Sequence, residues 1–195
     1  MDTVDTVQRR PGGRSAAVRG AVLEAALDAL ASGGAAPSIP ELAARAGVAA
    51  SSIYRRWGSW EAIVSDALLA GSDAAVPVPD TGSLREDLLA YTRSIARYLE
   101  SPRGHALARA AAMQGDAADG SVRERFWRLR FEAAVPMLER ARSRGELPAI
   151  GPEQDLLLLE LVVAPLHLRR LLTGADVQAD LVARIDLLLR AAGPR

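Results

Sequence analysis

The sequence predicts an all-α protein of about nine helices. Apolar residues make up 49% of the chain and aromatic residues only 4%. Most of the apolar residues are Ala and Leu, which lead the intrinsic helix ranking. Apolar positions recur at helical spacing along most of the chain, and no segment shows the alternation typical of a strand. A chain of 195 residues is long enough for one large domain, or for two small domains that share a helix.

The N-terminal segment combines a polar arm with a first helix. Residues 1–13 are polar and end in Pro11-Gly12-Gly13, which predicts a disordered arm. A helix is expected from Ser15, acting as the N-cap, to the glycine pair at 33–34. Four arginines and no acid lie between Thr6 and Leu23, so this region is either a DNA-contacting arm or a solvated tail. These arginines are Arg9, Arg10, Arg14 and Arg19.

A helix-turn-helix is predicted over about residues 38–57. Ser38 and Glu41 have the spacing of a capping box at the start of its first helix. Gly47 is expected to end that helix with a positive φ. The second helix, over 49–56, is short and has Ile53 and Trp57 on its buried side. A further helix is expected from Ser59 to about residue 70.

The best domain boundary follows this unit. The segment 71–82 holds two prolines and two glycines, and it predicts a junction between a domain of residues 14–70 and a helical domain of residues 71–195. Serine-glutamate pairs that begin at Ser83 and Ser121 have capping-box spacing. The helices expected in the second domain span about 83–100, 102–115, 121–144, 152–173 and 176–192.

Several classes of protein are excluded or find no support. Without cysteine, the chain has neither disulfides nor thiolate chemistry. The N-terminus lacks the apolar segment of a signal peptide, and the longest apolar run (156–166) is too short and too interrupted to span a bilayer. A cytoplasmic protein without membrane contact is therefore expected. Phosphate-binding glycine loops, GxSxG motifs and metal-spaced histidines are missing, so no enzyme, cofactor or metal site is predicted.

The exposed side of the second helix of the predicted helix-turn-helix has the chemistry of a DNA-reading surface. Small residues at its start allow close approach to the major groove, Tyr54 can reach a phosphate, and Arg55 or Arg56 can read guanine. The formal net charge of zero differs from the basic balance that is usual for such proteins. The residues expected to face DNA are Arg14, Ser38, Ala50, Ser51, Ser52, Tyr54, Arg55, Arg56 and Trp60.

Residues 15–70 resemble the DNA-binding domain of the TetR family of bacterial repressors. The resemblance rests on the turn at 46–48, the pair Ile53-Tyr54, the aromatic Trp57 and the Ser59-x-Glu61 helix opening. The YRRW ending and the segment APLHLRRLLTG (164–174) resemble one subgroup of the family. The resemblance implies an Ω-shaped homodimer, a four-helix interface formed by the last two helices, and a small-molecule pocket in the helical body.

Trp60 departs from the family pattern. The family usually has a lysine between the serine and the glutamate of the helix opening, and that lysine contacts a phosphate. Because Trp60 carries no charge, this contact is either missing or replaced by Arg55 or Arg56. Each lost phosphate contact lowers the salt slope of binding to B-DNA by about 0.9. The alternative for Trp60 is an exposed or half-buried aromatic at a helix start.

Two weaker sets of residues concern a ligand and a partner chain. A mostly apolar pocket with a polar handle is predicted at His105, Arg109, Met113, Trp127 and Phe131, which follow helical spacing on two helices; the alternative is ordinary core. The run 156–166 is apolar on nearly all sides, which indicates a second packing partner, the alternative being a central core helix. His167 is expected to pack at this interface. The interface residues expected are Leu157, Leu161, Pro165, Leu168, Leu181, Ile185 and Leu188.

These patterns predict a DNA-binding transcriptional regulator. The first hypothesis is a homodimeric repressor that an unknown small-molecule effector releases from a palindromic operator in double-stranded DNA. The second hypothesis is a helical dimeric module that binds small molecules or proteins and does not read DNA. Trp60 and the zero net charge favour the second, whereas the exposed tyrosine and arginines of the second helix favour the first.

Overall fold

The structure, a computed structural model, describes residues 13–113, 120–149 and 151–192. Within these ranges it contains nine α-helices and one π-helical segment, and it has no strand, which confirms the predicted all-α fold. The predicted arm, apart from Gly13, lies outside the described residues. The elements are α1 (Gly13–Ser32), α2 (Ile39–Ala46), α3 (Ala50–Arg56), α4 (Trp60–Ala75), α5 (Leu84–Glu100), α6 (Pro102–Met113), α7 (Gly120–Ser143), α8 (Pro152–Leu168), η1 (Arg169–Thr173) and α9 (Leu181–Ala192).

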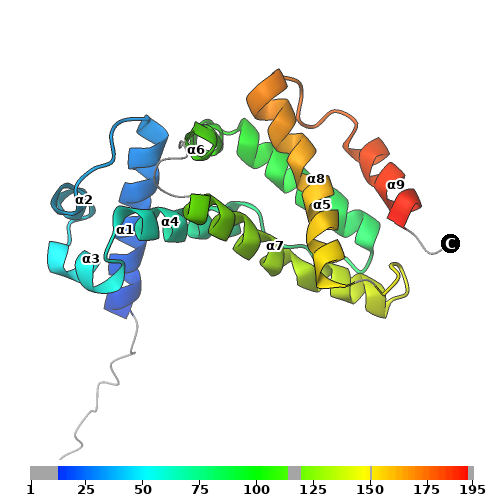
Figure 1. The fold of residues 1–195 in the computed structure, drawn as a ribbon, viewed down its shortest axis with the longest axis horizontal. Coiled ribbons are helices and arrows are strands. Elements are labelled where there is room, and N and C mark those ends of the chain that lie inside the picture. Colours follow the sequence, from blue (N-terminus) through cyan, green and yellow to red (C-terminus); the bar gives the residue numbers. More distant parts are fainter. Residues whose placement is uncertain (1–12, 114–119, 150, 193–195) are drawn as a thin grey trace, which may run out of the picture.

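The helices enclose two apolar cores. Helices α1 to α4 surround the first core, drawn in blue and cyan in Figure 1, and Leu107 of α6 completes it. Helices α5, α7, α8 and α9 surround the second core. Helix α4 packs against α1 at one core and against α7 at the other, so it is the main structural link between them. The largest fully buried side chains of the two cores are Leu42, Ile53, Ile63, Leu84, Leu88, Leu89, Tyr91, Leu99, Met137, Leu138, Leu159 and Leu166.

The ends of the first short helices follow the sequence signals. The Oγ of Ser38 accepts a hydrogen bond from the backbone N–H of Glu41, and the Glu41 carboxylate accepts one from the Ser38 backbone N–H, so the capping box is formed. Gly47 ends α2 with a φ of 66°, a conformation that favours glycine. The capping box thus sets where α2 begins, and Gly47 sets the tight connection between α2 and α3.

Three other helix starts differ from the expectation, and at α5 a tertiary contact replaces the local one. Ser15 and Ser121 lie inside α1 and α7, which begin at Gly13 and Gly120, so neither serine is an N-cap. Ser83 does precede α5, but its side chain makes no capping bond. The N-terminal N–H of Leu84 donates instead to the Glu146 carboxylate at 2.6 Å, which comes from the α7–α8 loop.

Helix α4 is longer and α9 shorter than the sequence predicts. Helix α4 continues through Gly71 to Ala75, where a break was expected. A Cβ atom at residue 71 would lie 3.1 Å from the Leu27 side chain, so the glycine serves close packing of α1 on α4 rather than a turn. Helix α9 begins at Leu181, not near residue 176, after a turn in which Asp180 has a positive φ.

The Asp66 carboxylate joins three helices of the first core. It lies on α4 and accepts a hydrogen bond from Trp57 Nε1 at 3.0 Å, just after α3. It also accepts two bonds from Arg19 of α1, from Nε at 3.2 Å and from Nη2 at 2.6 Å. Burial alone would raise the pKa of Asp66, but the hydrogen bonds from Arg19 and Trp57 outweigh it and hold this pKa below its usual value.

Replacing Asp66 with Ala should destabilise the protein by roughly 1–2 kcal/mol, a value kept small because the carboxylate is partly exposed to solvent. The physical reason is that Trp57 Nε1 and the Arg19 guanidinium lose their shared acceptor. Urea unfolding at neutral pH measures the change in the free energy of unfolding. Glu132→Ala, which breaks an exposed ion pair with Arg128, serves as the control and should change stability by less than about 0.5 kcal/mol.

The same variant should show a defined pH dependence. Because the folded-state pKa of Asp66 lies below the unfolded value of about 3.9, the carboxylate stabilises the fold above that pH. Its contribution is lost as the pH falls through the folded-state pKa. The difference in unfolding free energy between wild type and Asp66→Ala should therefore be constant near neutral pH and shrink in acid. A difference that grows in acid would contradict this account.

Candidate nucleic-acid interface and ligand pocket

Helix α3 is anchored on one side and open on the other. Ile53 is fully buried in the first core and Trp57 is half-buried. Tyr54 has 53% of its surface exposed, and Ser51, Arg55 and Arg56 are also exposed. Ala50 and Ser52 are half-buried. The structure therefore gathers the α3 residues that the sequence assigned to DNA contact on one exposed strip, with two members partly covered.

The two arginines of α3 have different surroundings. Arg56 donates from Nη1 to the Ser15 Oγ of α1 at 3.2 Å, and its guanidinium lies 5.4 Å from the centroid of the Trp57 ring. Arg56 is therefore held against the protein, whereas the side chain of Arg55 is exposed on the open side of α3. Helix α1 includes Arg14, but the side chain of Arg14 lies outside the described residues.

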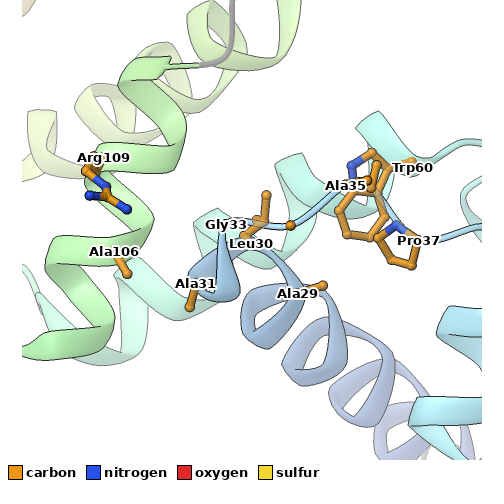
Figure 2. A pocket seen from close by; sticks show the side chains of 11 residues that line it. Ala29, Leu30, Ala31, Gly33, Ala35, Pro37, Trp60, Ala106 and Arg109 are labelled. Carbon is orange, nitrogen blue, oxygen red and sulfur yellow. The ribbon is translucent and has the colours of Figure 1, made fainter.

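Ser38 and Trp60 occupy helix starts on either side of α3. Ser38 is exposed at the N-cap of α2, where its hydroxyl and backbone N–H are both engaged with Glu41. Trp60 is the first residue of α4; it is half-buried and packs against the first core. Figure 2 shows its indole beside Ala35 and Pro37 of the α1–α2 loop. This packing matches the half-buried alternative for Trp60.

Arg109 lies apart from Trp127 and Phe131 of the predicted ligand pocket. It is exposed on α6 and lines a hollow of about 330 Å³, together with Trp60 and the α1–α2 loop. Figure 2 shows Arg109 and Ala106 at one end of this hollow and Trp60 at the other. His105 on the same helix is half-buried, and its Nδ1 has no hydrogen-bond partner among the described residues. The side chain of Met113 lies outside those residues.

Trp127 and Phe131 do come together, at a second hollow of about 410 Å³ between α7 and α8. The rings of Trp127 and Phe131 have centroids 5.5 Å apart. The edge of the His167 ring meets Trp127 with a centroid separation of 4.9 Å. The hollow is in the size range of small-molecule sites and has the mixture of aromatic walls and a polar group that such sites use. Its lining residues are Trp127, Phe131, Glu160, Val163, Ala164 and His167.

His167, which the sequence analysis expects at the dimer interface, lines this hollow. Its Nδ1 lies 3.3 Å from the Val163 carbonyl oxygen, a contact that fits the tautomer protonated on Nδ1. Burial lowers the pKa of His167, against a smaller opposite effect of that carbonyl, so the ring is neutral near pH 7. The other ring nitrogen, Nε2, is then an acceptor. Sequence spacing could not assign His167 because α8 is apolar on both sides.

The last two helices present an exposed apolar face. On α8, Leu157, Leu161 and Leu168 are each at least half exposed, at 54%, 57% and 50%. Pro165 and Leu188 are half-buried. Leu181 and Ile185 differ from the expected interface residues because both are buried in the second core, where α9 packs on α5. The exposed apolar residues that the sequence analysis missed are Leu172, Val182 and Leu187.

Two further structural findings bear on function. None of the helices in the described ranges is both long enough and apolar enough to cross a membrane. Across the same ranges, no three side chains of the metal-ligating kinds lie together.

The chain matches two family models and several known proteins. The model for bacterial regulatory proteins of the tetR family matches residues 22–67, and the model for the tetracyclin repressor-like C-terminal domain matches residues 78–187. The HTH-type transcriptional regulator AqdR of Rhodococcus erythropolis is 33% identical over 177 residues, which are 87% of this chain and 84% of that protein. The uncharacterised HTH-type transcriptional regulator YdeS of Bacillus subtilis is 31% identical over 175 residues, 88% of this chain and 86% of that protein.

A solved structure agrees with these matches. The crystal structure of the TetR family transcription regulator SCO0332 superposes with a TM-score of 0.69 at 26% identity, covering 91% of this chain and 99% of that chain. The anchored α3 with its exposed polar strip lies within the N-terminal match, and the hollow between α7 and α8 lies within the C-terminal match. The chain therefore belongs to the TetR family and is a DNA-binding transcriptional regulator with an N-terminal helix-turn-helix domain and a C-terminal ligand-binding domain.

Proposed function

We propose that the protein is a homodimeric repressor that a small-molecule effector releases from a palindromic operator. The observation that carries the proposal is the geometry of α3, which is anchored through Ile53 and Trp57 and exposes Tyr54 and Arg55. A helix fixed in this way can enter the major groove without losing its own packing. The proposal places the protein in the cytoplasm, where a bacterial operator lies.

The residues of the exposed strip divide by role. Arg55 is free to contact a phosphate or a guanine edge, and Tyr54 offers a hydroxyl at the same surface. Ser51 and Ser52 lie near the start of α3, beside Ala50, where short side chains permit close approach. Arg56 positions the end of α3 through Ser15 and Trp57. Membership of the subgroup with a YRRW ending is proposed on the sequence of residues 54–57.

Trp60 is proposed to support this surface rather than to contact DNA. Its indole packs against the first core and the α1–α2 loop, where Pro37 lies beside it. The phosphate contact that family members make with a lysine at this position passes to Arg55, whose charge lies on the open side of α3. Ser38 at the start of α2 and Arg14 in α1 are proposed as flanking phosphate contacts.

The dimer is proposed to form through the exposed apolar face of α8 and α9. Single exposed apolar residues are common on protein surfaces. A stripe of exposed leucines along one helix is a larger apolar patch, and such a patch marks an interaction surface. A two-fold axis through this face would pair it with itself and place two copies of α3 about 34–36 Å apart, one DNA turn. The exposed apolar residues of this region are Leu157, Leu161 and Leu168 on α8, Leu172 on η1, and Val182 and Leu187 on α9.

The effector is proposed to bind in the hollow between α7 and α8. It must favour an arrangement of the two α3 helices that does not fit the operator, because only a difference in affinity between the two states shifts their populations. The domain of residues 14–70 would read DNA and the domain of residues 71–195 would bind the effector. Helix α4 extends across this boundary to Ala75 and is the natural route between them.

The second candidate, a helical dimer that does not read DNA, retains two supporting observations. The formal net charge is zero, and Arg19 and Arg56 are both engaged within the protein. DNase footprinting on the DNA upstream of the protein's own gene separates the two candidates. If the protein protects a palindrome, and this protection weakens steeply as the salt concentration rises, the repressor function is supported. A dimer by sedimentation that protects no sequence would establish the second candidate.

Replacing Arg55 with Ala should weaken operator binding and lower the slope of log affinity against log salt by about 0.9, the value of one phosphate contact. Arg55 is a cleaner test than Arg56, since removing Arg56 also disturbs Ser15 and Trp57. Arg128→Ala on α7 removes an equal charge from an exposed site and is the matched control. Equal salt slopes for the two variants would argue against Arg55 as a phosphate contact.

Replacing Leu161 with Arg should convert the dimer into a folded monomer, because the new charge would be buried against its symmetric copy. Sedimentation measures the mass, and circular dichroism measures retained helix. Ala133→Arg adds the same side chain to an exposed position on α7 and should leave the dimer intact. A Leu161→Arg protein that remains dimeric would remove this face as the proposed interface.

A further inference from the structure

Arg130 holds the C-terminal end of α4. It lies on α7, and only 5% of its surface is exposed. Its Nη1 donates to the Asp73 carboxylate at 2.9 Å, and its Nη2 donates to the backbone oxygen of Val76, the C-cap of α4. The guanidinium also lies 5.5 Å from the centroid of the Tyr91 ring. A helix end leaves carbonyl oxygens without internal partners, so a cation at this position stabilises the last turn of α4.

The same guanidinium faces the proposed effector site. A small hollow of about 40 Å³ is lined by Arg130, Tyr91 and the end of α4. It adjoins the 410 Å³ hollow, since both are lined by Trp127, Phe131, Val163 and His167. For a ring seated in the larger hollow to reach Arg130, one small substituent must pass between these four shared side chains.

The two members of the Arg130–Asp73 pair differ in burial. The Arg130 side chain is 6% exposed, whereas the Asp73 side chain is 61% exposed. A buried guanidinium needs an anionic partner, because an unpaired buried charge is strongly destabilising. An exposed carboxylate that loses its partner is hydrated by water. A ligand carboxylate can thus replace Asp73 as the partner of Arg130 with little loss of stability, but a neutral group cannot.

We propose that the effector is an aromatic carboxylate and that it acts on α4 by taking Arg130 away from Asp73 and Val76. This inference rests on the proposed function of the protein as an effector-released repressor. The ring lies against Trp127, Phe131 and His167, and the carboxylate pairs with Arg130. The last turn of α4 then loses the contact that holds it to α7.

The released end of α4 is directly connected to the DNA-reading helix. Asp73 and Asp66 are seven residues apart on α4, which places them on the same side of the helix, about 10.5 Å apart along its axis. Asp66 holds Trp57 at the end of α3. Arginines from α1 and α7 thus hold α4 at two points, and releasing one of them allows α4 to move together with α3.

The Asp73→Asn variant tests this coupling; its amide oxygen can still accept a hydrogen bond from Arg130, and circular dichroism checks that the variant is folded. Operator affinity should fall roughly fivefold or more, the lower range of ordinary allosteric coupling, because α4 loses its ion pair with α7. Affinity for naphthoate, measured by calorimetry on the full protein, should rise by a similar factor, since Arg130 no longer has a competing anion. A purely structural role for Asp73 would lower both affinities.

Two controls sharpen the test. Asp186→Asn removes the carboxylate of another interhelical pair, in which Arg85 Nε lies 2.7 Å from Asp186 on α9, and it should change neither affinity. Naphthamide has nearly the shape of naphthoate without its charge and should bind wild type at least roughly tenfold more weakly, as expected when a buried charged partner is lost. Arg130→Gln, if it folds, should abolish the difference between the two compounds.

Several outcomes would overturn the proposal. Naphthamide binding as tightly as naphthoate, or neither compound binding at millimolar concentration, contradicts an aromatic carboxylate as effector. An unchanged operator affinity in Asp73→Asn contradicts the role of Arg130 in holding α4. If wild type protects no upstream DNA, the proposed repressor function fails, while calorimetry with naphthoate still reports on the Arg130 site by itself.

Discussion

The position of the DNA-reading helix depends on one partly buried carboxylate, that of Asp66. Helix α3 has only seven residues, too few to be stable by itself in water. Its place is set by the burial of Ile53 and by the hydrogen bond from Trp57 to Asp66, which Arg19 of α1 also engages. Burial of Ile53 and one acidic side chain on α4 therefore together set how Tyr54 and Arg55 are presented to solvent.

Helix α4 connects this arrangement to the rest of the molecule. It packs on α1 in the first core and on α7 near the second, and an arginine from each of those helices pairs with an aspartate on its surface. The hollow beside Trp127 and His167 lies next to the second of these pairs. The proposed effector hollow and α3 are thus connected through one helix, α4, whose two ends have different partners.

Helical spacing in the sequence predicted where helices form, but it did not predict which of their faces are exposed. The capping box of Ser38 and the turn at Gly47 are local signals, and the structure follows both. By contrast, α8 is apolar around most of its circumference, so its spacing could not tell the leucines that stay exposed from His167, which lines a hollow. The sequence predicted a helix break at Gly71 because it does not show that Leu27 packs against this glycine.

The sequence by itself determined the all-α class, the helix-turn-helix and the exposed composition of α3, because caps, turns and helical spacing depend on neighbours within a few residues. Only the tertiary structure decided which side chains meet across helices. Arg130 and Asp73 are 57 residues apart, and Arg19 and Asp66 are 47 apart. No local pattern pairs such residues, since their contact follows from the way that α4 packs between α1 and α7.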